Sequence, residues 1–511
     1  MVNTETYDYV VVGAGTAGCV LAARLTEDAG TRVLLIEAGS ADPLPLMAVP
    51  AAWPALLGSE ADWADRTVPQ EGADARVVPL PRGRALGGSS AINAMTFLRG
   101  HRSSYDAWEK AGATGWSYDE LLPYFKRSEN LAGVPGRNPR YRGTAGPLRV
   151  APAARPHPLS EAFFEAVRQA GHPITEDFTS GLTEAFGWED LTIVDGQRLD
   201  AATAYLRPVL DRPNLTVVTN ALAHRLTFDG KRCTGVEYGV GGQTHSAVAT
   251  QETVLTAGAL GSAGLLMLSG IGPEDHLREV GVEPRLHRPG VGANLQDHTF
   301  TGVVYRSARP VPPSTGNHGE VAGLIRTDPS LDGPDVQLQM VDVPLREDTL
   351  PGPEMDQGYT LMVALMRPFS RGTVRLADAT PGSALVVDPR YYTDQRDVDA
   401  LVSGLRTVRE IGLTDALADW RGEEALPGAD VQDDDGLRAY VRRNIRSYSH
   451  YSGTCRMGSD PEAVVDPRLR VRGVEGLRVA DASVMPSIVS ANTNATVYAI
   501  AERAAELLRT R

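Results

Sequence analysis

Residues 7–25 of the chain read YDYVVVGAGTAGCVLAARL, and residues 32–37 read RVLLIE. The apolar run before Gly13 is typical of a buried strand, and the residues after Gly18 have the apolar spacing of a helix. Gly13, Gly15 and Gly18 form the pattern GxGxxG at the turn between them. Strand, glycine turn, helix and second strand in this order predict the βαβ unit of a Rossmann-type nucleotide-binding domain.

The three glycines have separate physical roles in such a turn. Gly13 permits the tight turn, Gly15 lets the main chain approach a pyrophosphate, and Gly18 lets helix and strand pack closely. Backbone N–H groups at the helix start then face the phosphate charge. Glu37 lies 19 positions after Gly18, where an acid accepts from the ribose hydroxyls and disfavours the 2′-phosphate of NADP. The alternative is a glycine turn in a nucleotide-free α/β protein.

Length and composition restrict the class of protein. A chain of 511 residues exceeds the usual size of one domain, so two domains are expected. The net charge is −14 and no cluster of Lys and Arg occurs, so nucleic-acid binding is not expected. Cys19, Cys233 and Cys455 are far apart and in no metal-ligand spacing, which predicts free thiols and no metal site. Neither a signal peptide nor an apolar run of the ~18 residues that a membrane span requires is present, so we expect a cytoplasmic enzyme.

Residues 81–95, PRGRALGGSSAINAM, concentrate glycines and hydroxyl side chains. Main chain without bulky side chains can lie against a flat or charged ligand. Two interpretations stay open from the residues alone, a ligand-binding loop and an ordinary turn. Residues 105–125 have amphipathic helical spacing, which predicts helical structure there.

This loop and several further stretches resemble the glucose–methanol–choline family of FAD-dependent oxidoreductases. The resembling stretches are Asp62-Trp63 with Pro69-Gln70, residues 87–93 with Arg99-Gly100, residues 258–272, residues 292–298 and the tail from Ser447. They follow the family's order over nearly the whole chain and are most similar to the bacterial branch with choline dehydrogenase and hydroxymethylfurfural oxidase. The resemblance implies FAD as the cofactor. Ile92 stands where some members carry a histidine bonded to the flavin, so non-covalent FAD is expected.

The family's architecture implies two discontinuous domains. We expect an α/β fold, α+β overall, with a Rossmann-type FAD-binding domain made of residues 1–150, 201–298 and 441–511. Residues 151–200 and 299–440 are expected to form the substrate-binding (cap) domain, an antiparallel sheet with helices. Strand and helix patterns within residues 299–440 agree with this division.

The tail carries the residues expected to do chemistry. Oxidation of an alcohol removes the hydroxyl proton and a hydride; flavin N5 accepts the hydride, so the protein supplies a proton acceptor. By resemblance His450 is that base, and an imidazole with a pKa near 6.5 suits the task, although a lone histidine is more often structural. Asn492 aligns with the family's second catalytic position, where its amide would donate to the substrate oxygen; a helix cap is the alternative. A helix at residues 496–508 would direct its N-terminus at the flavin.

The resemblance also implies the contacts with the cofactor. The expected FAD-binding residues are Gly13, Gly15, Thr16, Ala17, Gly18, Glu37, Ala38, Gly87, Ser89, Ser90, Asn93, Ala94, Met95, Ala223, Asp481, Ala482, Asn492 and Thr493. Ala223 is equally compatible with a strand core, Asp481 with a simple cap, and His298 is interpreted as a structural partner. If residues 447–453 are extended, Tyr448 and His450 point the same way, so Tyr448 is expected to line the substrate pocket.

These observations predict an FAD-dependent alcohol oxidase or dehydrogenase that forms an aldehyde or ketone and passes its electrons to oxygen or another acceptor. The alternatives are an FAD-containing lyase or photodecarboxylase of the same fold and a nucleotide-binding protein without redox chemistry; a nicotinamide dehydrogenase is disfavoured by the tail. Aryl or furanic primary alcohols and choline-like alcohols both stay open as substrates. No anionic cage for a quaternary amine is evident, which favours neutral alcohols. The oligomeric state is not predicted.

Overall fold

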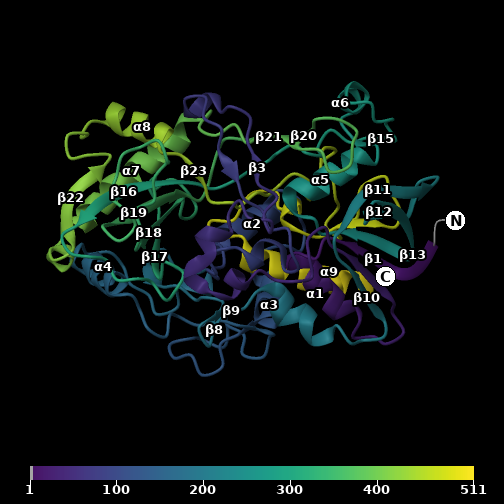
Figure 1. Cartoon of the computed structure of the whole chain (residues 1–511), viewed down its shortest axis with the longest axis horizontal. Helices are drawn as coiled ribbons and strands as arrows, with labels where there is room; N and C mark the ends of the chain where they lie inside the picture. The colour runs from purple at the N-terminus through teal and green to yellow at the C-terminus, as the bar shows by residue number, and fades with distance from the viewer. Residues whose placement is uncertain (1–3, 511) are drawn as a thin grey trace.

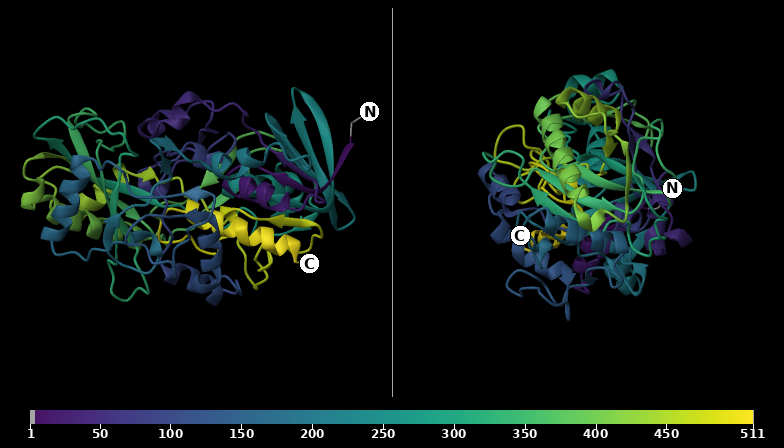
Figure 2. Two further views of the ribbon diagram at one scale, coloured as in Figure 1. Left: turned by 90° about the horizontal axis from the view of Figure 1, so that it is seen from below. Right: turned by 90° about the vertical axis from the view of Figure 1, so that its left-hand side faces the viewer.

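Two seven-stranded sheets organise the chain, of which the computed structural model describes residues 4–510. Figure 1 and Figure 2 show the sheets toward opposite ends of an elongated molecule, with both chain termini at the end of the first sheet. The first sheet has the order β10-β2-β1-β13-β12-β11, with β24 paired to β13. The second has the order β22-β16-β19-β18-β17-β7, with β23 paired to β16.

The first sheet contains the predicted βαβ unit. Its strands are β1 (Thr4–Val12), β2 (Val33–Ile36), β10 (Leu215–Val218), β11 (Ala221–Asp229), β12 (Arg232–Val240), β13 (Gln243–Leu255) and β24 (Leu477–Val479). Strand β1 pairs in parallel with β2 and β13, and helix α1 (Thr16–Leu25) makes the crossover from β1 to β2. All four residues of β2 are buried, as expected for a parallel strand covered on both faces. The Rossmann-type prediction is confirmed.

The second sheet is antiparallel. Its strands are β7 (Phe186–Trp188), β16 (Thr299–Ser307), β17 (Val321–Ile325), β18 (Val336–Val341), β19 (Gly358–Leu365), β22 (Arg421–Leu426) and β23 (Arg446–Ser447). Helices α4 (Pro158–Gln169), α7 (Gln395–Gly412) and α8 (Asp434–Arg443) pack their apolar sides into one core with one face of this sheet. The other face belongs to a second apolar cluster that includes residues of the tail. Because both faces are covered, every residue of β18 and β19 is buried.

The remaining elements connect these two layers. The other α-helices are α2 (Arg102–Lys110), α3 (Tyr118–Ser128), α5 (Gly258–Leu268), α6 (Glu274–Glu279) and α9 (Asn494–Arg509). The two-stranded sheets are β3 (Asp65–Arg66) with β4 (Pro79–Leu80), β5 (Glu129–Asn130) with β6 (Leu148–Arg149), β8 (Ile193–Val194) with β9 (Gln197–Arg198), β14 (Ile271–Gly272) with β15 (Leu286–His287), and β20 (Thr373–Leu376) with β21 (Leu385–Asp388). Short 3₁₀ or π turns are η1 (Pro45–Ala48), η2 (Pro50–Leu56), η3 (Glu71–Ala73), η4 (Gly88–Ala91), η5 (Phe178–Ser180), η6 (Ala202–Leu206), η7 (Arg207–Val209), η8 (Asp415–Leu417) and η9 (Ala482–Val484).

The helical structure predicted at residues 105–125 is present but interrupted. The segment forms two helices, α2 and α3, separated by a turn in which Gly112 and Gly115 have φ angles of +92° and +86°. This left-handed backbone is incompatible with a continuous right-handed helix, and glycine adopts it without a steric penalty. The predicted helices at residues 398–411 and 496–508 lie within α7 and α9.

One hairpin of the expected cap segment lies in the first core. Strands β20 and β21 contribute Val374, Leu376 and Val387 to the apolar cluster that contains β1 and β2. The domain boundaries given above stay a prediction. No helix within residues 4–510 has both the length and the apolarity that crossing a membrane would demand.

Candidate functional site

The glycine turn after β1 is tightly packed. Gly13 has a φ angle of +105°, and a Cβ atom there would lie 2.7 Å from the carbonyl oxygen of Thr256. A Cβ atom on Gly18 would lie 1.9 Å from the carbonyl oxygen of Gly13. Helix α1 begins at Thr16 with Gly15 as its N-cap, and no side chain of the described residues caps this end. Its first N–H groups are therefore available to an anion; Ala17 is in this first turn.

The second glycine-rich loop lies directly on the first. The Gly87 N–H donates to the carbonyl oxygen of Ala14 at 2.8 Å. A Cβ atom on Gly88 would lie 2.7 Å from the Cα atom of Gly15. The Ser90 hydroxyl donates to the Gly87 carbonyl at 2.6 Å and fixes the turn. Two stretches more than 70 residues apart in sequence thus bring main chain without side chains to one place, which favours the ligand-loop interpretation over an ordinary turn.

Glu37 closes the same site from the end of β2. Its buried carboxylate accepts from the N–H groups of Ala14 and Gly39, each at 2.8 Å. Burial raises the pKa of this carboxyl. Ala38 is half-buried beside it, and Ala223 is half-buried within β11, opposite Tyr238 of β12. The strand assignment of Ala223 is confirmed, while contact with a nucleotide stays a prediction.

The loop continues from η4 toward the second sheet. The Asn93 carboxamide oxygen accepts from the N–H of Met95 and from Arg198, both at 2.9 Å. Met95 has a φ angle of +59°, and the Ala94 carbonyl accepts from Asn317 at 2.8 Å. The Ser89 hydroxyl accepts from the N–H of Gly83 at 3.1 Å. Hydrogen bonds thus hold this loop in one conformation between the two domains.

The chain tail meets the glycine turn at the start of α9. The Thr16 hydroxyl donates to the carboxamide oxygen of Asn494, the first residue of α9, at 2.9 Å. Thr493 is the N-cap of α9, and within residues 4–510 no side chain caps this end. The helix cap considered for Asn492 is therefore wrong. The N-termini of α1 and α9 are held side by side, with free N–H groups at both.

Asp481 has the capping role that the sequence left as an alternative. Its carboxylate accepts from the N–H groups of Gly258 at 2.9 Å and Ser483 at 2.8 Å, and from the Ser262 hydroxyl at 2.5 Å. It thereby joins the start of α5 to the turn η9, where the Ala482 carbonyl accepts from the N–H of Gly453 at 3.2 Å. Contacts of Asp481 and Ala482 with a cofactor stay a prediction.

Residues 447–453 are not extended as expected. Ser449 has a φ angle of +61°, so the chain turns between Tyr448 and His450. The two rings nevertheless pack together, with their centroids 4.5 Å apart. Because the turn replaces strand alternation, the shared direction of the two side chains comes from ring packing rather than from the period of a strand.

His450 is fixed by a second histidine. Its Nδ1 atom lies 2.8 Å from Nδ1 of His298, with the two rings perpendicular. Its backbone N–H donates to Asp297 Oδ1 at 2.7 Å. Burial lowers the pKa of His450 to about 3, and burial followed by the neighbouring imidazole also lowers the pKa of His298. Both rings are therefore neutral at neutral pH, and one nitrogen must donate while the other accepts.

Asn492 lies on the other side of the same imidazole. Its Nδ2 atom is 3.4 Å from His450 Nε2. Its carboxamide oxygen is buried and has no hydrogen-bond partner among the described residues. A buried acceptor without a partner is uncommon in folded proteins and points to a ligand at this place.

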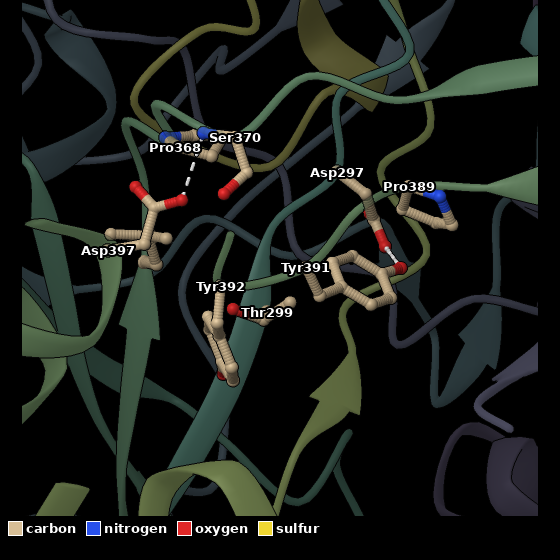
Figure 3. Close-up of a pocket in the computed structure, with 9 residues that line it drawn as sticks. Asp297, Thr299, Pro368, Ser370, Pro389, Tyr391, Tyr392 and Asp397 are labelled. Atoms are coloured by element: carbon tan, nitrogen blue, oxygen red, sulfur yellow. Dashed lines mark hydrogen bonds between the residues drawn. The ribbon is translucent and has the colours of Figure 1, made fainter. Parts of the chain in front are cut away.

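Asp297 supports His450 from behind and was missed by sequence reasoning. Its carboxylate accepts from the hydroxyls of Ser447 and Tyr391, each at 2.6 Å, and burial raises its pKa to about 6. Figure 3 shows Asp297 and Tyr391 beside a cavity that Thr299 and Tyr392 also line. The cavity of about 10 Å³ holds no more than one water molecule. The resembling stretch at residues 292–298 contained this aspartate, so a signal was present.

A second polar chain starts at the ring beside His450. The Tyr448 hydroxyl donates to the Gln339 carboxamide oxygen at 3.1 Å, and Gln339 Nε2 donates to Glu189 Oε1 at 3.0 Å. The Thr96 hydroxyl donates to the other Glu189 oxygen at 2.8 Å. Burial raises the pKa of Glu189 to about 8. The sequence signal for this polar chain was the alternation of Gln337 and Gln339 with apolar residues in β18.

Comparisons with known proteins agree with this geometry. Residues 7–300 and 368–501 match the N- and C-terminal parts of a family described as GMC oxidoreductase. The chain is 43% identical to mitochondrial choline dehydrogenase of Homo sapiens, over 99% of this chain and 90% of that protein. It superposes on pyridoxine 4-oxidase from Mesorbium loti with a TM-score of 0.95, 39% identity and 99% coverage of both chains. Formate oxidase of Aspergillus oryzae, studied for FAD modification, has a TM-score of 0.92 at 27% identity, with coverage of 100% and 99%.

Proposed function

Because the chain belongs to the GMC oxidoreductase family of FAD-dependent alcohol oxidoreductases, we propose that His450 is the base with which it oxidises an alcohol to a carbonyl compound. The observation that carries this proposal is the buried neutral imidazole of His450, held at Nδ1 by His298 and facing Asn492 with Nε2. A base must have a free lone pair at working pH, and this ring has one.

The residues present fit an FAD molecule. Two side-chain-free loops meet at Gly15 and Gly88, and the uncapped helix starts at Thr16 and Asn494 lie beside them. Such a donor set suits a pyrophosphate and the electron-rich edge of a flavin. Glu37 lies at the end of β2 where a ribose is expected. Ile92 is a buried apolar residue and offers no atom for a covalent link, which supports non-covalent binding.

Bound FAD supplies the acceptor for the hydride. His450 removes the hydroxyl proton, and its tautomer follows from its two neighbours. The Asn492 amide N–H points to Nε2, which places the His450 proton on Nδ1, where His298 Nδ1 accepts it. Of the two histidines, only His450 then presents a lone pair to the substrate, on its Nε2 atom.

Asn492 is proposed to hold the substrate oxygen. An amide cannot act as a base near neutral pH, but its N–H group can donate to an oxygen that gains negative charge. The substrate hydroxyl would lie beside Asn492 Nδ2 and His450 Nε2, within hydrogen-bond reach of both. The two nitrogens are 3.4 Å apart, so the contact that the substrate replaces is long and weak.

A neutral aryl or furanic primary alcohol is proposed as the substrate. One relative acts on choline and one structural neighbour on pyridoxine by their names, so both kinds of alcohol occur among similar proteins. Glu189 is the acid nearest to Tyr448 along the hydrogen-bonded chain, and its raised pKa of about 8 keeps it mostly protonated at pH 7. A mostly neutral carboxyl is a poor partner for a quaternary amine, which supports the neutral substrate. Oxygen or another acceptor reoxidises the reduced flavin and completes the catalytic cycle. The three cysteines are buried free thiols, as expected in a reducing compartment, which supports a cytoplasmic location.

Anaerobic mixing of the holoenzyme with alcohols, followed by flavin absorbance, tests the proposal. We expect bleaching in the dark, with His450→Gln keeping its FAD and reducing it about 10²–10⁴-fold more slowly. His245→Gln, on β13 of the first sheet, is the matched control and should react as the unchanged enzyme does. A flavin that stays oxidised with every alcohol would favour the lyase alternative, and full-rate reduction in His450→Gln would refute the base.

A further inference from the structure

The proposed base lies on a bulge in the ladder between β16 and the tail. Thr299 pairs with Ser447, and Gln296 pairs with Ser452. Between these two pairs lie two residues on the first strand and four on the tail, so the tail carries two extra residues. His450 is one of the four. A bulge bends its strand and redirects a side chain, and bulges are over-represented beside active sites.

Side chains accept the main-chain N–H groups of this bulge in place of a strand partner. The His450 N–H donates to Asp297 Oδ1 at 2.7 Å, and the Ser449 N–H donates to the Ser447 hydroxyl at 2.9 Å. That hydroxyl donates in turn to Asp297 Oδ2 at 2.6 Å. One carboxylate, 4% exposed, thus holds both N–H groups, directly or through Ser447. Because buried backbone N–H groups are nearly always paired, loss of this carboxylate would release the turn at Ser449, whose φ angle is +61°.

Tyr391 holds the same carboxylate from a third segment of the chain. Its hydroxyl donates to Asp297 Oδ2 at 2.6 Å (Figure 3). Its own N–H donates to Oε1 of the buried Gln70 at 2.9 Å. Gln70 Nε2 donates in turn to Asp388, the last residue of β21, at 3.0 Å. Pro69-Gln70, one of the stretches that resemble the family, therefore fixes the position of Tyr391 behind the base.

Asp297 and His298 divide the support of the base between them. His298 binds the imidazole ring at Nδ1, whereas Asp297 binds the main chain of His450. The position of the ring relative to Asn492 depends on both contacts, because a side chain reaches only as far as its Cα atom allows. Misplacement of a reacting group by about 1 Å can cost about 100-fold in rate. The main-chain contact is therefore expected to affect the reaction although the carboxylate lies behind the base.

We propose that Asp297 and Tyr391 are positioning residues, which hold the bulge in the one conformation in which His450 meets the substrate. The inference rests on the proposed function and deepens it. The His450 N–H requires an oxygen acceptor at Asp297 but no negative charge, and a carboxamide or a protonated carboxyl also offers such an oxygen. Asp297→Asn is therefore expected to resemble the unchanged enzyme, whereas Asp297→Ala removes the acceptor.

Tyr391→Phe and Tyr392→Phe form a matched pair of variants that tests this role. The two tyrosines are neighbours, each is 3% exposed, and both line the cavity in Figure 3. The Tyr392 hydroxyl has no hydrogen-bond partner among the described residues, so Tyr392→Phe controls for the loss of a hydroxyl as such.

The assay is anaerobic reduction of the holoenzyme flavin by benzyl alcohol, or by choline if benzyl alcohol leaves the flavin oxidised. We expect the limiting rate to fall about 3–10-fold in Tyr391→Phe and to stay unchanged in Tyr392→Phe. The FAD content and the dissociation constant of the alcohol should be the same in both variants, because neither hydroxyl is placed in the cofactor site or the substrate site.

Two further comparisons separate positioning from general damage to the fold. Asp297→Ala should lower the limiting rate about 10–100-fold, and Asp297→Asn should retain at least about a third of it. In His450→Gln, the addition of Tyr391→Phe should change the residual rate by less than about twofold, because a positioning residue acts only through the base. If Asp297→Ala does not fold, the two tyrosine variants decide alone.

The inference is overturned if Tyr391→Phe reacts at the unchanged rate, or if Tyr392→Phe loses as much. It is also overturned if Tyr391→Phe lowers the residual rate of His450→Gln by the same factor, or if Asp297→Asn is as slow as Asp297→Ala. Failure of the proposed function looks different, since His450→Gln itself would then reduce its flavin at the full rate. A slow His450→Gln beside a full-rate Tyr391→Phe means that the positioning role alone fails.

Discussion

The second-order rate constant for flavin reduction, kcat/KM, is predicted to stay constant between pH 8 and pH 5. Burial lowers the pKa of His450 to about 3. With that value about 99% of the imidazole is neutral at pH 5, whereas an ordinary histidine with a pKa of about 6.5 would be about 3% neutral. An exposed base would therefore lose about 30-fold in rate over this interval, and His450 should lose almost nothing.

The assay is anaerobic stopped-flow reduction with benzyl alcohol, which has no group that titrates between pH 5 and pH 8. Because kcat/KM reports the pKa values of the free enzyme, the profile reads the imidazole before substrate binds. Because Asp297 has a pKa of about 6 and also titrates in this interval, the profile is repeated with Asp297→Asn. A fall of one decade per pH unit with a midpoint near 6.5 in both proteins would refute the reasoning, since it would show an imidazole in contact with water. Retention of the flavin spectrum across the range is the control for loss of cofactor.

The same lowered pKa has a consequence for stability. The unfolded chain binds a proton at His450 below pH 6.5 and the folded chain does not, so its contribution to the free energy of unfolding falls as the pH drops from 6.5 toward 3. At pH 5 the loss is about 2 kcal/mol. Comparison with His450→Gln isolates it from Asp297, whose raised pKa acts in the opposite direction.

Three further outcomes are expected. His298→Phe removes the acceptor for the Nδ1 proton of His450, so flavin reduction should slow about tenfold while the FAD content stays unchanged. His298→Gln, which keeps an acceptor, should recover part of the rate. An unaltered rate in His298→Phe would exclude a positioning role for His298. Gly88→Val should yield folded protein without flavin absorbance, because a Cβ atom there meets the Cα atom of Gly15 at 2.7 Å; stoichiometric FAD in the purified variant contradicts this. Arg142→Met removes the cation that Glu129, Asp177 and Asp190 share, so the free energy of unfolding, measured with denaturant, should fall by about 3–5 kcal/mol. A change of less than about 1 kcal/mol would speak against a coupled ion-pair network.

Much of the first domain could be predicted because its signals are local. The run before Gly13, the three glycines and Glu37 lie within 31 residues and specify strand, turn, helix and strand by spacing alone. His450 was identified from the residues around it, not from any period. Gly112 and Gly115 could have marked the break between α2 and α3, since two glycines within a helical pattern are a stop signal. The left-handed Ser449 had no such signal, because serine rarely adopts that backbone and only packing of the tail enforces it.

Residues from distant strands could not be brought together by sequence reasoning. Gln337 and Gln339 alternate with apolar residues, a pattern that ordinarily means one face of the strand is in water. Here both faces are covered, so the same alternation separates one apolar core, on the side of α7, from a second apolar cluster on the side of the tail, into which the two glutamines are placed. Which meaning applies depends on what packs on the second face, and that is decided by the tail more than 100 residues later. Gln339 shows the consequence, because its partners are Tyr448 of the tail and Glu189, neither of which lies near it in the sequence.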